Sequence, residues 1–509
     1  MKSNFQYWTL LTLVLHVFQV AYSQGTGLIL EDEVYNAMPQ ISEVFASGEK
    51  MSELPLKYTL KEHCPKIINQ GQIGSCVGWS SGYGAFTIMK AQNEGWTDEA
   101  VITENAYSAL YIYNQVKIGS CGQGSLFSDA LKFLKTEGDC LSKEFDYPND
   151  DCNRQPNKEH KVAAQSSNYE VKEYFTLFRS TDKAKQKIEQ TKLSISEDKP
   201  VIIGMLIREN FKYLSKEDKY WNPEVGNTAS AGGHAMVIVG YNDGKEAFEV
   251  MNSWGSQWGN DGYFWLKYDD FAKYCLYGYQ LLVKKKKIDV VTKNDKGEDP
   301  FAPNSGTDEI EEADVLELGA EFIFRYPSGY DDEKEEFLFT PSDIHFNGTY
   351  YDLTNHDWNK NNRFQLVTKD ITKDKYVYVF SIDPDNKPMI HWPRNEKFNA
   401  KFFSLNEGAL VPYNKVEIIV PGRENVLIKD KTGVDYLFVL YSEEPIEDLP
   451  KRIGDIIEHP NNYITAMQNT FGERLIPIND ISYQSNKMKF TTTTSSGGYI
   501  APIVLKIEK

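Results

Sequence analysis

Hydrophobic and polar positions divide the chain into many strand-like runs and a few helix-like ones. In the second half, short β-branched and aromatic runs bounded by turn residues predict strands. These runs are residues 376–382, 416–420, 436–441 and 499–507. Helix-compatible runs cover residues 80–91 and 445–457, and a further helix is expected just before Gly472. The pattern therefore predicts a mixed first half and a mainly β second half.

The first 23 residues have the pattern of an export signal. Lys2 supplies a positive charge, residues 8–20 form an apolar run, and Ala21 and Ser23 place small side chains at the two cleavage positions. An uncut membrane anchor is the alternative, but the apolar run is short for a span. We therefore expect residues 1–23 to be removed as a signal peptide, with no stable membrane insertion afterwards.

Composition divides the rest of the chain into four parts. Residues 24–55 form a short, pro-like N-terminal segment, and residues 56–283 hold all six cysteines and most of the glycine-rich turns. A lysine run followed by polar residues, prolines and glycines predicts a linker over 284–314. The remaining residues, 315–509, are predicted to form a β-rich domain that holds together without a disulfide.

Composition and charge exclude several classes of protein. The chain has 509 residues, of which 41% are hydrophobic and 25% charged, as is typical of two or three globular domains. Its net charge of −18 repels phosphate backbones, so we expect no nucleic acid partner. The sequence has neither a C-x-x-C pair nor an H-E-x-x-H motif, so we expect no metal site and no cofactor.

Three segments far apart in the sequence fit one chemical mechanism. A glycine-rich loop leads to Cys76 at the start of a predicted helix, where the helix dipole favours the nucleophilic thiolate. His234 follows two glycines at the start of a predicted buried strand, and Asn252 ends another. A cysteine and a histidine make a thiolate–imidazolium nucleophile that an asparagine can orient. Each residue alone has a structural explanation, such as a disulfide or packing, but their combination favours catalysis.

At these residues the sequence resembles the papain-like cysteine peptidases of the C1 type. The resemblance implies that Cys76 is the nucleophile, His234 the general base and Asn252 the residue that orients the imidazole. Gln70 matches the family's oxyanion-hole glutamine, and Trp254 matches the indole that shields the hydrogen bond between histidine and asparagine. The N-terminus resembles that of exported bacterial members of the family.

The resemblance covers about residues 56–283 and also implies a strip that binds the substrate backbone. The residues expected to contact substrate are Gly122, Gln123, Gly124 and Gly233. A helix over residues 128–134 is expected to follow this strip.

Departures from the family pattern leave the disulfides open. Ile73 stands where the family commonly has a cysteine, Val77 where it has a tryptophan, and Gln123 where it has a glycine. Cys121 therefore lacks the family's usual disulfide partner. With Cys76 set aside, two bridges among five cysteines allow about 15 arrangements. We expect the bridged set to be Cys64, Cys121, Cys140 and Cys152.

The fold that the resemblance implies is α+β. A helical lobe that opens with the Cys76 helix faces an antiparallel, β-barrel-like lobe that carries His234 and Asn252, and the cleft lies between them. Residues 315–509 are expected to be mainly antiparallel β, similar to an uncharacterised bacterial domain that is appended to peptidases and kinases. Residues 24–55 are too short for the family's helical pro-domain, so we expect them to pack on the catalytic domain rather than to act as a full inhibitor.

The implied function is that of an exported cysteine peptidase that hydrolyses protein or peptide substrates, with endopeptidase action expected. Its location would be secreted, periplasmic or at the cell surface. Two alternatives remain at this point: a non-catalytic binding module with the papain-like fold, and an acyltransferase that passes the acyl group to an amine. Intact residues at all four functional positions favour the peptidase over the binding module.

Overall fold

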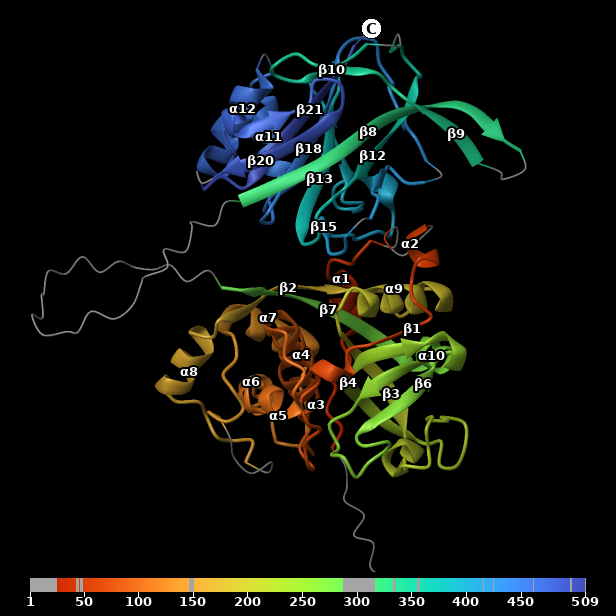
Figure 1. Ribbon diagram of the computed structural model, residues 1–509, viewed down its shortest axis with the longest axis vertical. Coiled ribbons are helices and arrows are strands. Elements are labelled where there is room, and N and C mark those ends of the chain that lie inside the picture. The colour runs from red at the N-terminus through yellow and green to blue at the C-terminus, as the bar shows by residue number, and fades with distance from the viewer. Residues whose placement is uncertain are drawn as a thin grey trace, which may run out of the picture.

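Two parts of the chain, with an N-terminal segment between them, make up the computed structural model (Figure 1). The structure describes residues 25–508 apart from 43–44, 46–48, 146–150, 287–315, 333–335, 355–357, 415, 424, 461 and 495–496. The predicted signal peptide, and the predicted linker beyond Lys286, lie outside the described residues.

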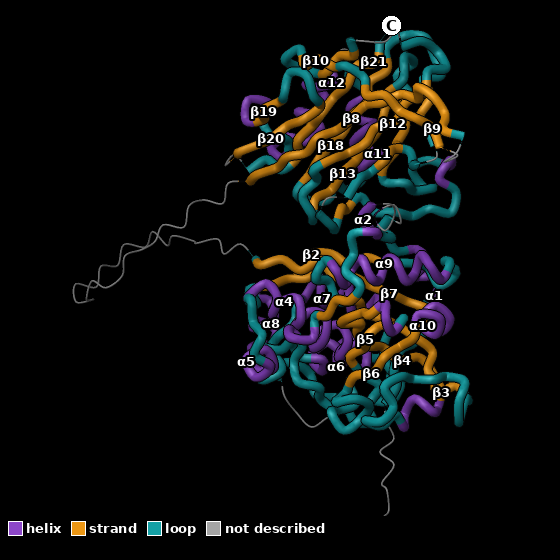
Figure 2. Tube along the Cα trace, turned by 45° about the vertical axis from the view of Figure 1, so that its right-hand side comes forward, coloured by secondary structure: helices purple, strands orange, loops and turns teal. Residues whose placement is uncertain are grey.

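Short helices form one side of the first part (Figure 2). One helix runs from Cys76 to Glu94 in three consecutive segments, so the helix predicted over 80–91 is confirmed and is longer at both ends. It ends at Gly95, which has the left-handed backbone (φ +67°) that favours glycine. The helices are α3 (Cys76–Gly78), η3 (Trp79–Phe86), α4 (Thr87–Glu94), α5 (Glu99–Glu104), α6 (Ala109–Val116), α7 (Phe127–Glu137) and α8 (Lys158–Gln165). The helix expected over 128–134 is α7.

A seven-stranded antiparallel sheet forms the other side of this part, in the order β2-β7-β3-β4-β5-β6 with β1 beside β4. The predicted strand of His234 is β4 (Ser230–Asn242), and β5 (Ala247–Met251) ends directly before Asn252. The other elements are β1 (Lys57–Thr59), β2 (Tyr169–Thr176), β3 (Val201–Arg208), β6 (Tyr263–Lys267), β7 (Cys275–Lys285), α9 (Ala184–Ser196) and α10 (Tyr268–Tyr274). Helices on one side and an antiparallel sheet on the other confirm the predicted α+β class.

Two more sheets of seven strands each form the second part, which we call the C-terminal region. One sheet has the order β10-β11-β21-β18-β13-β14 with β15 beside β13, and the other has β16-β12-β8-β20-β19 with β17 beside β12 and β9 beside β8. Among these described strands only the β11–β21 pair is parallel, so the prediction of a mainly antiparallel region is confirmed.

The bounds of the elements in the C-terminal region test the predicted runs directly. The strands are β8 (Leu316–Asp331), β9 (Glu336–Pro341), β10 (Ile344–Phe346), β11 (Tyr351–Leu353), β12 (Arg363–Lys369), β13 (Lys375–Ile382), β14 (Pro388–Trp392), β15 (Leu410–Val411), β16 (Ile419–Val420), β17 (Leu427–Ile428), β18 (Asp435–Ser442), β19 (Ile481–Tyr483), β20 (Met488–Thr494) and β21 (Ile500–Ile507). Three of the four predicted strands are therefore confirmed.

The fourth predicted strand, residues 416–420, is wrong for most of its length. Only Ile419 and Val420 pair with β12 in a ladder. Ile418 adds a single backbone hydrogen bond from Thr368 of β12, and Val416 is buried outside the strand. Helix α11 (Leu449–Ile457) begins later than predicted, with Pro450 in its first turn, where proline fits best. Helix α12 (Tyr463–Phe471) ends directly before Gly472, as predicted.

One disulfide, Cys121–Cys152, is present, although two bridges were expected. Cys121 thus finds its partner in the loop before α8. The inclusion of Cys64 and Cys140 in the bridged set is wrong, because both are buried free thiols. Cys140 packs in an apolar cluster with aromatic side chains, where a thiol acts as a small hydrophobic group.

Asp139, just after α7, is a fully buried carboxyl group. Burial raises its pKa well above the usual range, and the backbone amides of Cys140 and Ser108 offset only part of this rise. Because the folded-state pKa is the higher one, the free energy of unfolding falls as the pH rises above about 4, where unfolded aspartate ionises.

We expect Asp139→Asn to raise the free energy of unfolding by about 1–3 kcal/mol at pH 8 and to change it little at pH 4, because asparagine carries no charge to bury. Denaturant unfolding of both chains at the two pH values measures this difference. An equal change at both pH values would contradict the role of the charge.

Candidate active site

Cys76 is the first residue of α3, and its side chain is fully buried. The loop before it brings α3 into contact with β4, the strand that carries His234. The backbone amides beside the thiol include that of Ala235, which follows the histidine, and that of Gly27 from the N-terminal segment. The cysteine and histidine segments thus meet between the helices and the sheet, in a space that we call the cleft.

His234 and Asn252 are joined by a hydrogen bond of 2.8 Å between Nε2 and Oδ1. The same Oδ1 accepts the backbone N–H of Ser253 at 2.8 Å, which turns the amide oxygen toward the imidazole. Because an amide oxygen only accepts, Nε2 must carry the proton, and Nδ1 is left as the basic nitrogen. Nδ1 has no hydrogen-bond partner among the described residues, so it is available to take a proton.

Trp254 packs on the imidazole, with the two ring centres 4.7 Å apart. Phe211 supports both rings, at 5.3 Å from the indole and 6.2 Å from the imidazole. The indole N–H donates to the carbonyl of Gly25 at 3.1 Å. This aromatic wall removes His234 from water and holds its ring in one position, as the sequence predicts for Trp254.

Gln70 is fully buried and held at both ends of its amide. The Ser253 hydroxyl donates to Oε1 at 2.6 Å, and Nε2 donates to the carbonyl of Ile73 at 3.0 Å. The NH₂ end therefore points toward the loop that leads to Cys76. Since an amide nitrogen has two hydrogens, one N–H remains for a developing oxyanion beside that cysteine.

Two of the four residues predicted to bind the substrate backbone line the cleft. A Cβ atom at Gly124 or Gly233 would collide with the backbone of the N-terminal segment, so both glycines lie directly against a chain. Gly122 has open space around it, and the side chain of Gln123 accepts the backbone N–H of Ser120 at 2.7 Å within its own turn.

Residues 56–281 match the family model of the papain family cysteine proteases. They form a papain-family cysteine peptidase domain. An uncharacterized peptidase C1-like protein of Acanthamoeba polyphaga mimivirus is 27% identical over 251 residues, which cover 46% of this chain and 72% of the viral protein. The cathepsin B-like CP2 of Giardia intestinalis is 26% identical over 219 residues, or 42% of this chain and 68% of that protein.

Solved structures of cysteine proteases also align with this chain. Xylellain, a cysteine protease from Xylella fastidiosa, is 23% identical, with a TM-score of 0.41 over 51% of this chain and 96% of its own. The family match stops before the C-terminal region. The match of residues 56–281 to the papain family shows a cysteine-type peptidase, and this family implies protein or peptide substrates.

Residues 25–29 of the N-terminal segment lie in the cleft of the peptidase domain, and we call them the blocking segment. Their backbone hydrogen bonds are Gly25 N–H to Gly71 O (3.1 Å), Leu28 N–H to Gly233 O (3.2 Å), Ile29 N–H to Ser125 O (3.2 Å) and Ser125 N–H to Gly27 O (2.9 Å). The segment thus bonds to both walls of the cleft. The backbone amide of Gly27 lies beside the Cys76 thiol.

The blocking segment fits in the cleft because Gly27 and Gly74, which have no side chains, lie against each other. A Cβ atom on Gly27 would overlap the backbone of Gly74, including its carbonyl oxygen, and no rotation of a side chain could relieve that overlap. A side chain at position 27 is therefore incompatible with this position of the segment.

Leu28 fills a small apolar pocket in the peptidase domain and is 6% exposed. A Cβ atom on Gly204 of β3 would lie 2.7 Å from the end of the Leu28 side chain and about as close to the rings of Tyr277 and Phe127. The pocket exists because position 204 has no side chain.

Burial changes the chemistry expected of Cys76 and His234. Burial raises the pKa of Cys76 to about 12 and lowers the pKa of His234 to about 4. Both groups are therefore neutral at pH 7, and the expectation of a thiolate is wrong for this state. The N-terminal segment packs on the catalytic domain as expected, and residues 25–29 lie in the cleft beside the thiol.

Sequence analysis missed two residues that shape the site. Ser253 stands inside the Asn-Ser-Trp-Gly motif, yet its hydroxyl bond to Gln70 gave no separate signal. Gly204 lies within an apolar strand, where an isolated glycine often marks the close approach of another chain. That signal was present and could have indicated a pocket at β3.

The described part of the chain contains no group of three or more His, Cys, Asp and Glu side chains that could hold a metal ion. None of its helices has the length and apolar character needed to cross a membrane.

Proposed function

We propose that this peptidase hydrolyses peptide bonds with Cys76 as the nucleophile, His234 as general base and acid, and Asn252 as the residue that orients the imidazole. The observation that carries the proposal is the bond of 2.8 Å between His234 Nε2 and Asn252 Oδ1. It supports one tautomer, in which Nδ1 is free to take the thiol proton.

Catalysis begins when the blocking segment leaves and a substrate carbonyl takes its place. Nδ1 of His234 takes the proton of the Cys76 thiol, and the sulfur attacks the carbonyl carbon. The backbone N–H of Cys76 and the free N–H of Gln70 stabilise the oxyanion. When the C–N bond breaks, Nδ1 returns the proton to the leaving amine, and a thioester remains. Nδ1 then deprotonates a water, which releases the acid and restores the thiol.

The blocking segment also supports a proposal for substrate binding. Gly124, Gly233 and Ser125 would bond the substrate backbone, because they line the path that the segment takes. The pocket filled by Leu28 would receive an apolar side chain, since the rings of Tyr277 and Phe127 line it. Gly122 and Gln123 stay proposed contacts for longer substrates.

We further propose that the chain is exported, with residues 1–23 as its signal peptide, as in the exported bacterial branch that its N-terminus resembles. The Cys121–Cys152 disulfide supports a secreted, periplasmic or cell-surface location, because disulfides persist in oxidising compartments.

We also propose a division of the chain into four parts after the signal peptide. These are an N-terminal segment (24–55), a catalytic domain (56–283), a linker (284–314) and a β-rich domain (315–509). The separate sheets of the last part support this division.

Hydrolysis of fluorogenic peptides tests the proposed function. The assay compares peptides with leucine or aspartate on the acyl side of the cut bond, and it uses a Gly27→Val chain to keep the segment out of the cleft. We expect turnover of the leucine peptide and its loss in a chain that also carries Cys76→Ala. Equal turnover in both chains, or none in either, would overturn the proposal. Transfer of the acyl group to an added amine without free acid would replace hydrolysis by acyl transfer.

A further inference from the structure

Residues 37–42 and Phe45, which we call the anchor segment, are built into the C-terminal region. Gln40 donates its N–H to the carbonyl of Asn406 at 2.9 Å and accepts the N–H of Gly408 at 3.0 Å. The side-chain amide of Asn406 donates to the carbonyls of Ala37 and Met38 at 3.0 and 2.9 Å. The anchor segment is thus bonded along its backbone to one loop of the C-terminal region.

Side chains strengthen this attachment. Glu407 and Arg394 form a buried ion pair with two hydrogen bonds, of 2.6 and 2.8 Å, and the hydroxyl of Ser42 donates to the same carboxylate at 2.7 Å. The side chain of Phe45 is 1% exposed. Its ring centre lies 6.2 Å from that of Trp392 and 6.1 Å from that of Tyr413. We call the residues of the C-terminal region in these contacts the clamp surface: Trp392, Arg394, Asn406, Glu407, Gly408 and Tyr413.

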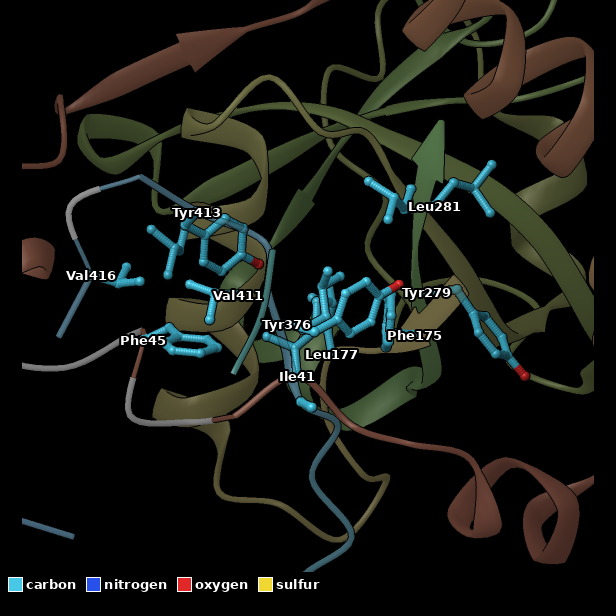
Figure 3. Close-up of a cluster of buried hydrophobic side chains, with 14 of the residues drawn as sticks. Ile41, Phe45, Phe175, Leu177, Tyr279, Leu281, Tyr376, Val411, Tyr413 and Val416 are labelled. Carbon is cyan, nitrogen blue, oxygen red and sulfur yellow. The ribbon is translucent and has the colours of Figure 1, made fainter. Parts of the chain in front are cut away.

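The anchor segment also bonds to the peptidase domain, so it lies between the two parts. Ile41 donates its N–H to the carbonyl of Thr176, at the end of β2, at 2.9 Å. Figure 3 shows Ile41 and Phe45 among apolar side chains of both parts. The peptidase domain contributes Phe175, Leu177, Tyr279 and Leu281, and the C-terminal region contributes Tyr376, Val411, Tyr413 and Val416.

One short helix connects the anchor segment to the blocking segment. Helix α1 (Asp32–Ala37) packs on the peptidase domain, on the side near the C-terminal region (Figure 1), and its Tyr35 is 1% exposed against the rings of Tyr277 and Tyr279. The Glu31 N–H also donates to the Tyr277 hydroxyl at 2.7 Å, so the peptidase domain holds this stretch too. Because few residues separate the anchor from the cleft, the anchor adds a second limit on how far the blocking segment can move away. A segment held in this way has a high effective concentration at the cleft.

We propose that the C-terminal region functions as an intramolecular clamp, whose clamp surface binds the anchor segment and thereby keeps the blocking segment over Cys76. This assigns a regulatory function to the β-rich region, and it rests on the proposed catalytic role of Cys76. Release of the anchor segment from the clamp surface, rather than any change in the catalytic residues, would open the cleft.

The test loosens the anchor in the full chain with Ser42→Ala and Phe45→Ala together. These changes remove the hydroxyl bond to Glu407 and the ring between Trp392 and Tyr413, and they leave the ion pair of the clamp surface intact. We expect the rate at which an epoxide probe labels Cys76 to rise about tenfold. In a Cys76→Ala background, amide hydrogen exchange across residues 25–36 should rise by a similar factor.

The matched control is Lys172→Ala with Lys284→Ala. These lysines pair with Glu444 and Glu443 of the C-terminal region at 3.1 and 2.8 Å, so the control breaks contacts between the same two parts without touching the anchor segment. We expect it to leave labelling and exchange across residues 25–36 near those of the unchanged chain.

Two results would overturn the clamp: no rise in the anchor variant, or an equal rise in the control. Ser42→Ala alone, which removes a single oxygen, keeps the test valid if the double variant does not fold, and it should show a smaller rise. A Gly27→Val chain separates the two proposals. If that chain is not labelled, the catalytic proposal fails; if it is labelled while the anchor variants stay slow, only the clamp fails.

Discussion

Gly27→Val is expected to raise both Cys76 alkylation and peptide hydrolysis at pH 7 by about a hundredfold over the unchanged chain. The valine side chain would overlap the backbone of Gly74, so the segment could not return to its place over the thiol. In the unchanged chain, only the small fraction of molecules with the segment out of the cleft can react. The substitution makes that fraction the whole population without altering any residue of the peptidase domain.

The pH dependence of Cys76 alkylation should change when the blocking segment leaves the cleft. In the closed chain the pKa of Cys76 is raised to about 12 and that of His234 is lowered to about 4, both because of burial. An open cleft returns water to both groups, so the thiol pKa falls and the imidazole pKa rises, which allows a thiolate–imidazolium pair near neutral pH. Alkylation rates measured from pH 4 to pH 10 should therefore reach their midpoint at a lower pH in the Gly27→Val chain.

Thr26→Val is the matched control for this prediction. It introduces the same side chain one residue earlier, at a position that is not fully buried, and threonine and valine have nearly the same shape. We expect it to leave the alkylation rate close to that of the unchanged chain. Equal rates and pH profiles for Gly27→Val and the unchanged chain would show that the segment does not control access to Cys76.

In the Gly27→Val background, His234→Ala is expected to lower kcat/KM for peptide hydrolysis by about 10⁴. Without the imidazole, no group accepts the thiol proton or protonates the leaving amine. Alkylation of Cys76 should then follow the pKa of an ordinary thiol, about 8.5. Steady-state hydrolysis and the pH profile of alkylation measure these two effects separately.

Asn252→Ala provides the graded comparison. It removes the hydrogen bond of 2.8 Å to the imidazole but leaves the base in place, so we expect a smaller loss of about a hundredfold. Activity that survives His234→Ala, or a loss from Asn252→Ala as large as from His234→Ala, would contradict the roles given to these two residues.

The residues that we propose as reactive stand out in the sequence because each lies in a short motif with its own signal. Cys76 follows a glycine-rich loop, His234 follows two glycines, and Asn252 belongs to Asn-Ser-Trp-Gly. The strands of the C-terminal region were found for a similar reason, since an apolar run between turn residues is a local feature. The run at 416–420 failed because burial does not require a partner strand.

The state of the site could not be predicted, because it depends on contacts between distant segments. Residues 25–29 carry no motif, and their place in the cleft follows from Gly74, Gly124 and Gly233, which leave room for a second backbone. A thiol at a helix start predicts a thiolate only where water reaches it, and here the segment excludes water. The Cys121–Cys152 pairing likewise follows from which loops meet in space.

The most direct test of the account is mass spectrometry of the chain after treatment with an epoxide probe for papain-type thiols. We expect the Gly27→Val chain to gain one adduct at Cys76, the unchanged chain to gain the same adduct much more slowly, and a Gly27→Val chain with Cys76→Ala to gain none. No adduct at Cys76 in the Gly27→Val chain, or an equally fast adduct in the unchanged chain, would contradict a Cys76 nucleophile held latent by residues 25–29.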